Sequence, residues 1–156
     1  YSDLHAIREH AVKSDLVIGA VLIPGGRTPV LINKEMLKDM LPGSVIIDVG
    51  VDQGGCIETT RPTTHAEPIY IIDEVVHYCV ANMPGAVGRT STQALCHATQ
   101  PYAIALAEAL GGDGLEALVR KRADFNSALN IHNGKVTHEE VAHALGLEYD
   151  GSLALG

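Results

Sequence analysis

Three apolar runs, each closed by residues rich in proline or glycine, constrain the fold of this chain most strongly. They are Leu16–Ile23, Val45–Val51 and Tyr78–Ala81, and their length and β-branched content are typical of buried strands. A shorter run, Tyr70–Ile72, predicts one more strand. Hydrophobic residues make up 46% of the chain but aromatic residues only 4%, so the core must be built from aliphatic side chains. A core of that kind suits a parallel sheet covered by helices.

Helical patterns separate the predicted strands. Ser2 is placed to cap a helix that runs to about Lys13, and Asn33 to cap a second helix that Pro42-Gly43 ends. Strands that alternate with helices or long crossovers predict an α/β fold with a parallel, doubly wound sheet.

The last third of the chain changes to helices alone. Thr90 or Ser91 opens a long helix that Gly111 ends, with a kink expected at Pro101 inside it. Asp113 is placed to cap a further helix. Thr137 begins a capping-box pattern before a final short helix that Gly146 ends.

Charge and cysteine content narrow the class of protein. The formal net charge of −8 and the scattered basic residues argue against nucleic acid as a partner. Three cysteines without C-x-x-C spacing are expected to be reduced thiols, as in a cytoplasmic protein. No apolar run reaches the roughly 18 residues of a membrane span, and no signal peptide is recognisable. Because the chain starts at Tyr1 rather than Met, we expect it to be part of a longer protein.

Polar side chains follow two of the predicted strands at their carboxyl ends, where doubly wound sheets bind ligands. Asp52 is the strongest catalytic candidate, because period-2 alternation puts it on the same strand face as Asp48, beside two glycines. A carboxylate there can orient a polar substrate or handle a proton, or can instead bind only its own turn. Asn82 can pair with a carboxamide or hydroxyl, or can serve only as a turn residue. Asp48 lies inside the strand and is expected to be structural, satisfied by nearby backbone groups.

Other polar residues carry weaker signals. The eight histidines show no helix-borne ligand spacing with a third partner, so no metal site is predicted. Cys79 is expected to behave as a small buried hydrophobe. The Arg61–Thr64 segment is able to contact a phosphate, although an exposed loop is the commoner role of such a stretch.

Three long segments resemble the alanine dehydrogenase family, which includes the pyridine nucleotide transhydrogenases. They are GAVLIPGGRTPVLI (residues 19–32), IIDVGVDQGGCIETTRPTTH (46–65) and YCVANMPGAVGRTSTQAL (78–95), and the closing THEEVAHALG (137–146) also fits. The similarity covers nearly the whole chain. Motifs of this length in this order are far more specific than a single glycine pattern.

The resemblance implies the carboxyl-terminal portion of an NAD-dependent enzyme that converts L-alanine reversibly to pyruvate and ammonium. Residues 1–90 would be the second half of a Rossmann-type NAD-binding domain. Residues 91–156 would be a connecting long helix and helices of the substrate domain. The implied oligomer is a homohexamer. Asp52 would face the nicotinamide and substrate as the catalytic residue, and Asn82 would lie close to the nicotinamide. The NAD site would be lined by Val21, Leu22, Val49, Gly50, Val51, Asp52, Val80, Ala81, Asn82 and Met83.

The family's glycine-rich turn, its ribose-binding acidic residue and its substrate-domain Lys, His and Arg would all precede Tyr1. We therefore expect this chain alone to be inactive and to bind NAD weakly, with the missing amino-terminal half as its partner. Two alternatives stay open. One is the NAD-binding domain of a transhydrogenase α subunit, although that domain usually lacks the D-Q-G-G-C of residues 52–56 and the A-N-M-P of residues 81–84. The other is a non-catalytic module that binds nucleotide or assembles.

Overall fold

The computed structural model describes residues 3–154, and the chain divides into two compact units. The first comprises Tyr1–Ile23 with Arg27–Ala86, and the second comprises Pro24–Gly26 with Val87–Gly156. Among the described residues, no helix combines the length and apolarity that crossing a membrane would need. Each unit has its own elements and is described separately.

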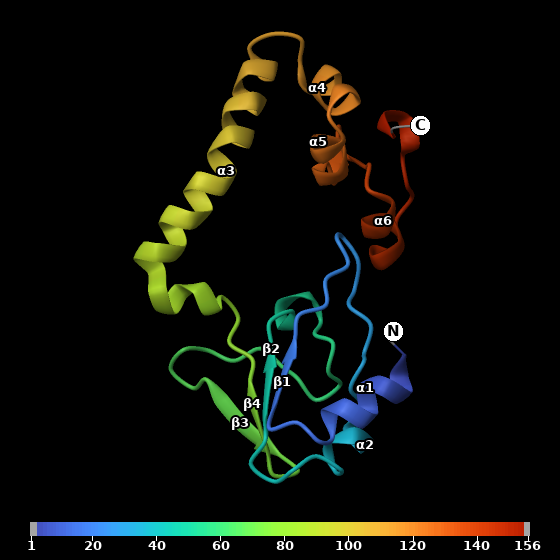
Figure 1. Ribbon diagram of the computed structural model, residues 1–156. Coiled ribbons are helices and arrows are strands. Elements are labelled where there is room, and N and C mark those ends of the chain that lie inside the picture. Colours follow the sequence, from blue (N-terminus) through green and yellow to red (C-terminus); the bar gives the residue numbers. More distant parts are fainter. Residues whose placement is uncertain (1–2, 155–156) are drawn as a thin grey trace. The chain divides into compact units, whose positions relative to one another are not determined.

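A four-stranded sheet forms the centre of the first unit (Figure 1). Its strands are β1 (Leu16–Gly19), β2 (Val45–Asp48), β3 (Ile69–Ile72) and β4 (Val75–Tyr78), in the spatial order β1-β2-β4-β3. β1, β2 and β4 run parallel. The predicted α/β fold with a parallel sheet is therefore confirmed, and the carboxyl ends of three strands meet at one edge of the sheet.

The fourth strand departs from the predicted all-parallel arrangement. β3 pairs with β4 antiparallel, because the two residues between them, Asp73 and Glu74, have positive φ angles of 48° and 62°. Two consecutive left-handed residues make the tight turn of a β-hairpin. That turn also moves the last strand toward the amino terminus, to Val75–Tyr78, rather than the predicted Tyr78–Ala81.

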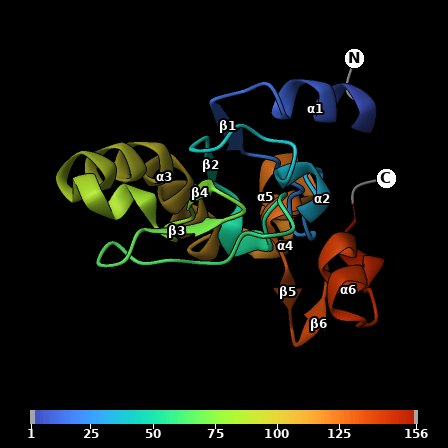
Figure 2. The same cartoon turned by 90° about the horizontal axis from the view of Figure 1, so that it is seen from below.

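Two helices, α1 (Leu4–Ala11) and α2 (Lys34–Leu37), lie on one side of this sheet (Figure 2). Asn33 caps α2 as predicted, its Oδ1 accepting from the backbone N–H of Met36 at 3.0 Å. Asp3 caps α1 through the N–H of Ala6, whereas the predicted cap, Ser2, lies outside the described residues. The core between helices and sheet is aliphatic, with fully buried Leu37, Ile46 and Val75 among its members.

The second unit is mainly helical. It contains α3 (Gly88–Leu110), α4 (Leu115–Lys121), α5 (Ala123–Ala128) and α6 (Glu139–Leu145), with a short hairpin of β5 (Ile131–His132) and β6 (Lys135–Val136). Residues 3–154 also contain three 3₁₀ helices: η1 (Val51–Gln53) in the first unit, η2 (Met83–Val87) at the chain position where the first unit ends, and η3 (Gly151–Leu153) in the second. α3 continues through Pro101, and Figure 1 shows that it bends in its amino-terminal part.

Two predicted caps in this unit are wrong. α4 begins after Gly114, which has a φ of 91°, and Asp113 instead forms an ion pair with Lys121 at 3.2 Å. α6 begins after His138 without a side-chain cap, because the Thr137 hydroxyl donates to the carbonyl of Leu129 at 2.9 Å. The end of α6 at Gly146, in the left-handed conformation, agrees with the prediction.

Candidate active site at the carboxyl ends of the strands

The parallel register brings the carboxyl ends of β1, β2 and β4 together. Gly19 lies beside Asp48, and Ile47 lies beside Tyr78. Beyond β1 and β2 the backbones stay close, because a Cβ atom at Gly50 would lie 3.3 Å from the carbonyl oxygen of Val21. The first two predicted cofactor-binding segments are therefore adjacent, and the third follows β4 at the same edge of the sheet.

The loop after β2 is built around the buried carboxylate of Asp48. Its Oδ1 accepts from the N–H of Gly50 at 3.1 Å, and its Oδ2 accepts from the N–H of Cys56 at 3.2 Å. The hydroxyl of Thr60 donates to the same Oδ2 at 2.7 Å. These bonds satisfy a carboxylate that has no solvent exposure, as the structural interpretation of Asp48 predicted.

Asp52 lies in η1 within that loop, and its side chain is exposed. The prediction that Asp52 shares a strand face with Asp48 is wrong, because β2 ends at Asp48 and the chain turns into a 3₁₀ helix. Gly54, with a φ of 98°, closes that helix. The turn leaves Asp52 at the carboxyl-end edge, where an exposed carboxylate is available to a ligand.

Asn82 occupies the turn after β4. Its φ of 59° is left-handed, a conformation that Asn tolerates better than most residues. Its carbonyl oxygen accepts from the N–H of Gly85 at 2.9 Å and from Nε2 of His65 at 3.0 Å. The Asn82 side chain is exposed. The backbone is thus fixed by two donors while the residue remains open to solvent.

The predicted cofactor-binding residues differ in burial. Val51 and Val80 are buried, so only their backbone groups are placed to meet a ligand. Leu22 and Val49 expose 60% and 51% of their surface. Val21, Gly50, Ala81 and Met83 are intermediate. Exposed aliphatic side chains beside polar turns suit the flat, partly apolar rings of a nucleotide.

Several side chains that organise this edge were not singled out from the sequence. Thr60 bonds to Asp48, 12 residues away in the sequence, and His65 bonds to Asn82, 17 residues away. No local sequence pattern indicates hydrogen bonds over such separations. Arg27 packs its side chain over Gly54, where a Cβ atom would lie 3.4 Å from both Cγ and Nε of the arginine. The Gly54-Gly55 pair was the one available sequence signal at this edge, because D-Q-G-G is typical of a turn.

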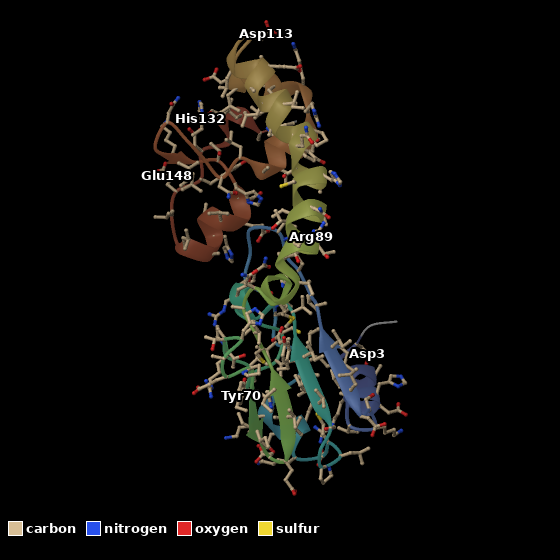
Figure 3. The ribbon with its side chains drawn as sticks, turned by 90° about the vertical axis from the view of Figure 1, so that its left-hand side faces the viewer. Asp3, Tyr70, Arg89, Asp113, His132 and Glu148 are labelled. Carbon is tan, nitrogen blue, oxygen red and sulfur yellow. The ribbon has the colours of Figure 1, made fainter. Side chains whose placement is uncertain are left out.

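A second buried network lies behind the loop, where Tyr70 of β3 (Figure 3) stacks on His77 of β4 with ring centroids 5.0 Å apart. The Tyr70 hydroxyl donates to the carbonyl of Thr59 and accepts from the N–H of Arg61. The Arg61 guanidinium lies over the Tyr70 ring at 4.3 Å. Burial, followed by the hydrogen bond between the Tyr70 hydroxyl and the Cys79 sulfur, raises the pKa of Tyr70 to about 12. This network holds the 57–61 segment against the hairpin.

No cluster of three or more His, Cys, Asp or Glu side chains suited to a metal ion occurs in residues 3–154. A hollow of about 420 Å³ occurs in the second unit beside Lys135 and Asp150. Those two side chains form an ion pair at 3.3 Å with each other, so the hollow gains no unpaired charge from them.

The family model described as "Alanine dehydrogenase/PNT, C-terminal domain" matches residues 1–139. This chain belongs to that family. An alanine dehydrogenase of Halomonas elongata is 56% identical over 96% of the chain, and one of Mycolicibacterium smegmatis is 44% identical over 96%. In each case the chain spans 39% of the relative, well under half of its length.

Solved structures of the alanine dehydrogenase/PNT family agree in fold. An L-alanine dehydrogenase superposes with a TM-score of 0.70 at 42% identity, covering 94% of this chain and 39% of that one. A transhydrogenase from Sinorhizobium meliloti superposes with a TM-score of 0.53 at 32% identity, covering 59% of this chain and 26% of that one. The predicted resemblance to alanine dehydrogenases is confirmed.

Proposed function

We propose that this chain is the carboxyl-terminal part of an NAD-dependent alanine dehydrogenase, which converts L-alanine, NAD⁺ and water to pyruvate, ammonium and NADH. The observation that carries the proposal is the family match over residues 1–139, combined with the convergence of three strand ends. Asp52 and Asn82 follow two of those strands and are both exposed there.

The cofactor fits the residues at this edge. Leu22 and Val49 offer exposed aliphatic surface, and Asn82 offers an exposed carboxamide. Gly50 has no side chain, which lets the backbone after β2 lie close to the carbonyl of Val21. The proposed NAD-binding residues are Val21, Leu22, Val49, Gly50, Val51, Asp52, Val80, Ala81, Asn82 and Met83. When bound, NAD⁺ accepts the hydride from the substrate carbon. A primary amide such as that of Asn82 has both a donor and an acceptor, so it can pair with the nicotinamide carboxamide.

Asp52 is the proposed catalytic residue of this chain. Its exposed carboxylate is free to orient a polar group or to hold a proton during interconversion of amine and carbonyl. The loop that carries it is held from below by Asp48, Cys56 and Thr60, which limits the positions that Asp52 can take.

The proposal extends to the complete protein. We assign residues 1–90 to the NAD-binding domain and residues 91–156 to the connecting helix and the substrate domain. The complete enzyme is proposed to be a cytoplasmic homohexamer. Light scattering can test this by measuring the molar mass of the oligomer. Because this chain spans 39% of the Halomonas relative, groups outside it are expected to bind the substrate, and the isolated chain is expected to be inactive.

The test joins this chain to the amino-terminal portion of the Halomonas elongata enzyme, replacing the 39% of that enzyme that it matches. The chimaera should reduce NAD⁺ with L-alanine and oxidise NADH with pyruvate and ammonium, whereas the isolated chain should do neither. The Asp52→Asn chimaera should bind NADH and lose alanine turnover by roughly 100-fold or more. The Asp39→Asn chimaera, altered at an exposed acid of the first unit, serves as control.

The outcomes separate the alternatives. A chimaera that binds NADH yet never turns over alanine would favour a transhydrogenase-type domain. A chimaera that folds without binding NADH would favour a non-catalytic module. Turnover by the isolated chain would contradict the need for the remainder of the enzyme.

A further inference from the structure

The side chain of His65 donates a hydrogen bond to the backbone at Asn82, from a different loop. Nε2 of His65 lies 3.0 Å from the carbonyl oxygen of Asn82. A carbonyl oxygen only accepts, so Nε2 must carry the proton, and the neutral ring must be the Nε2–H tautomer. The bond therefore ties the turn after β4 to a segment 17 residues earlier.

The backbone that His65 holds is in an uncommon conformation. Asn82 has a φ of 59°, and a left-handed residue other than glycine costs roughly 1 kcal/mol. The N–H of Gly85 donates to the same carbonyl at 2.9 Å. Two donors that converge on one oxygen from separate segments fix the orientation of that peptide plane, and with it the direction in which the Asn82 side chain leaves the backbone.

Gly85 lies close to both the Asn82 carboxamide and the His65 imidazole. A Cβ atom at Gly85 would lie 3.0 Å from Nδ2 of Asn82 and 3.2 Å from Nε2 of His65. The carboxamide and the imidazole thus lie over the same bare stretch of backbone. The Asn82 carboxamide thus has Gly85 close to its Nδ2 atom, while the residue remains exposed to solvent.

The loop that carries His65 is itself anchored to the sheet. The N–H of Thr63 donates to the carbonyl of Cys79 at 2.9 Å, and the N–H of Ala81 donates to the carbonyl of Thr63 at 3.2 Å. The Thr63 hydroxyl donates to the carbonyl of Pro68 at 3.0 Å. The loop that carries His65 is therefore held in place by hydrogen bonds. Because of this, the bond from His65 can fix the position of the Asn82 peptide.

We infer that His65 is a positioning residue for the reaction: by hydrogen bonding to the Asn82 carbonyl, it aims the Asn82 carboxamide at the nicotinamide. This inference rests on the proposed function, because it concerns the amide that NAD is proposed to meet. His65 does not touch the reacting atoms. Its effect would be to hold the Asn82 carboxamide where it can orient a bound nicotinamide to accept hydride, and small errors in such an orientation are costly in rate.

The test uses the chimaeric enzyme described above with two substitutions at one position. In His65→Leu the donor is lost, and kcat for alanine oxidation should fall roughly 10-fold while KM for L-alanine changes little. In His65→Gln the side-chain amide replaces the Nε2–H donor, and kcat should recover to within about 3-fold of the parent. His5→Leu, altered at an exposed histidine of α1, is the matched control and should leave kcat unchanged.

Two further readouts separate positioning from general weakening of the fold. With L-alanine deuterated at the α-carbon, the isotope effect on kcat should rise in His65→Leu, because hydride transfer becomes slower relative to other steps. In an Asn82→Gly background, which tolerates the left-handed backbone but lacks the carboxamide, His65→Leu should cause no further loss.

Each result decides between the hypotheses. An active parent chimaera whose kcat and isotope effect are unchanged by His65→Leu would overturn the positioning role alone. Additive losses in the Asn82→Gly background would also overturn it, because His65 would then act independently of the carboxamide. A parent chimaera without alanine turnover would overturn the proposed function, and the positioning role with it.

Discussion

The Oδ2 atom of Asp48 and the hydroxyl of Thr60 form a 2.7 Å hydrogen bond that closes the loop carrying Asp52. The same oxygen accepts from the N–H of Cys56, so one buried carboxylate holds two points of this loop. Hydrogen bonds to a charged acceptor are stronger than neutral ones, and a buried partner left unpaired is costly. The loop that carries the exposed Asp52 is therefore held rigidly by these hydrogen bonds.

Substitution of Gly55 should disrupt these hydrogen bonds. Gly55 has a φ of 70°, and a Cβ atom there would lie 2.5 Å from Oδ2 of Asp48 and 2.6 Å from Oγ1 of Thr60. Gly55→Ala should lower the free energy of unfolding by roughly 3 kcal/mol, measured by urea denaturation. Gly43→Ala is the control, because its φ of 83° is equally left-handed but no atom lies within 4 Å of the added carbon. Its cost should be about 1 kcal/mol, and equal losses would contradict the crowding argument.

Most of the fold could be predicted because its signals are local. Buried strands give apolar runs, and the cap at Asn33 depends on residues three positions apart. The hairpin between β3 and β4 could not be predicted, because Asp73-Glu74 lacks the glycine or asparagine that usually marks such a turn. Asp113 and Thr137 are residue types that often cap helices, but here they bond to Lys121 and to the carbonyl of Leu129 instead. The sequence pattern could not show these competing partners.

The site was predictable only to the level of its segments. Strand ends and turn residues singled out Asp52 and Asn82 as candidates, because parallel sheets bind ligands at the edge formed by the carboxyl ends of their strands. The 3₁₀ helix that contains Asp52 could not be predicted from period-2 alternation, because that pattern assumes that the strand continues to Asp52. The bond from His65 to Asn82 joins separate loops, so only coordinates reveal it.

The buried His77 should make stability depend on pH. Its Nδ1–H donates to the carbonyl of Val75, so Nε2 accepts from the Thr59 hydroxyl, and burial lowers the pKa of His77 below its ordinary value of about 6.5. The unfolded chain then binds more protons than the folded chain below that pH. The free energy of unfolding should therefore fall as pH decreases from about 7 to about 5. His77→Phe keeps a ring beside Tyr70 and should show a smaller slope, whereas an unchanged slope would contradict the assignment.

Tyr70 should ionise later than an ordinary tyrosine. Burial and the hydrogen bond between its hydroxyl and the Cys79 sulfur raise its pKa to about 12, against about 10 for a free side chain. An ultraviolet titration of the native chain should show a tyrosinate phase near pH 12 that is absent from Tyr70→Phe. Tyr149→Phe should retain this phase and serves as the control. Loss of the late phase in urea would confirm that the fold causes the shift, and its persistence in Tyr70→Phe would refute the assignment.

The three cysteines should react with N-ethylmaleimide in two kinetic classes. Cys56 and Cys79 are 3% and 0% exposed, and burial raises the pKa of both thiols, which lowers the fraction of reactive thiolate. Cys96 lies exposed on α3. At about pH 7 one thiol should therefore react quickly and two slowly. Cys96→Ser should abolish the fast phase, whereas Cys79→Ser should leave it intact. Urea should make all the thiols react at similar rates, because unfolding removes the burial that distinguishes them. A fast phase that survives in Cys96→Ser would contradict the prediction, because one of the two buried thiols would then be accessible in the native chain.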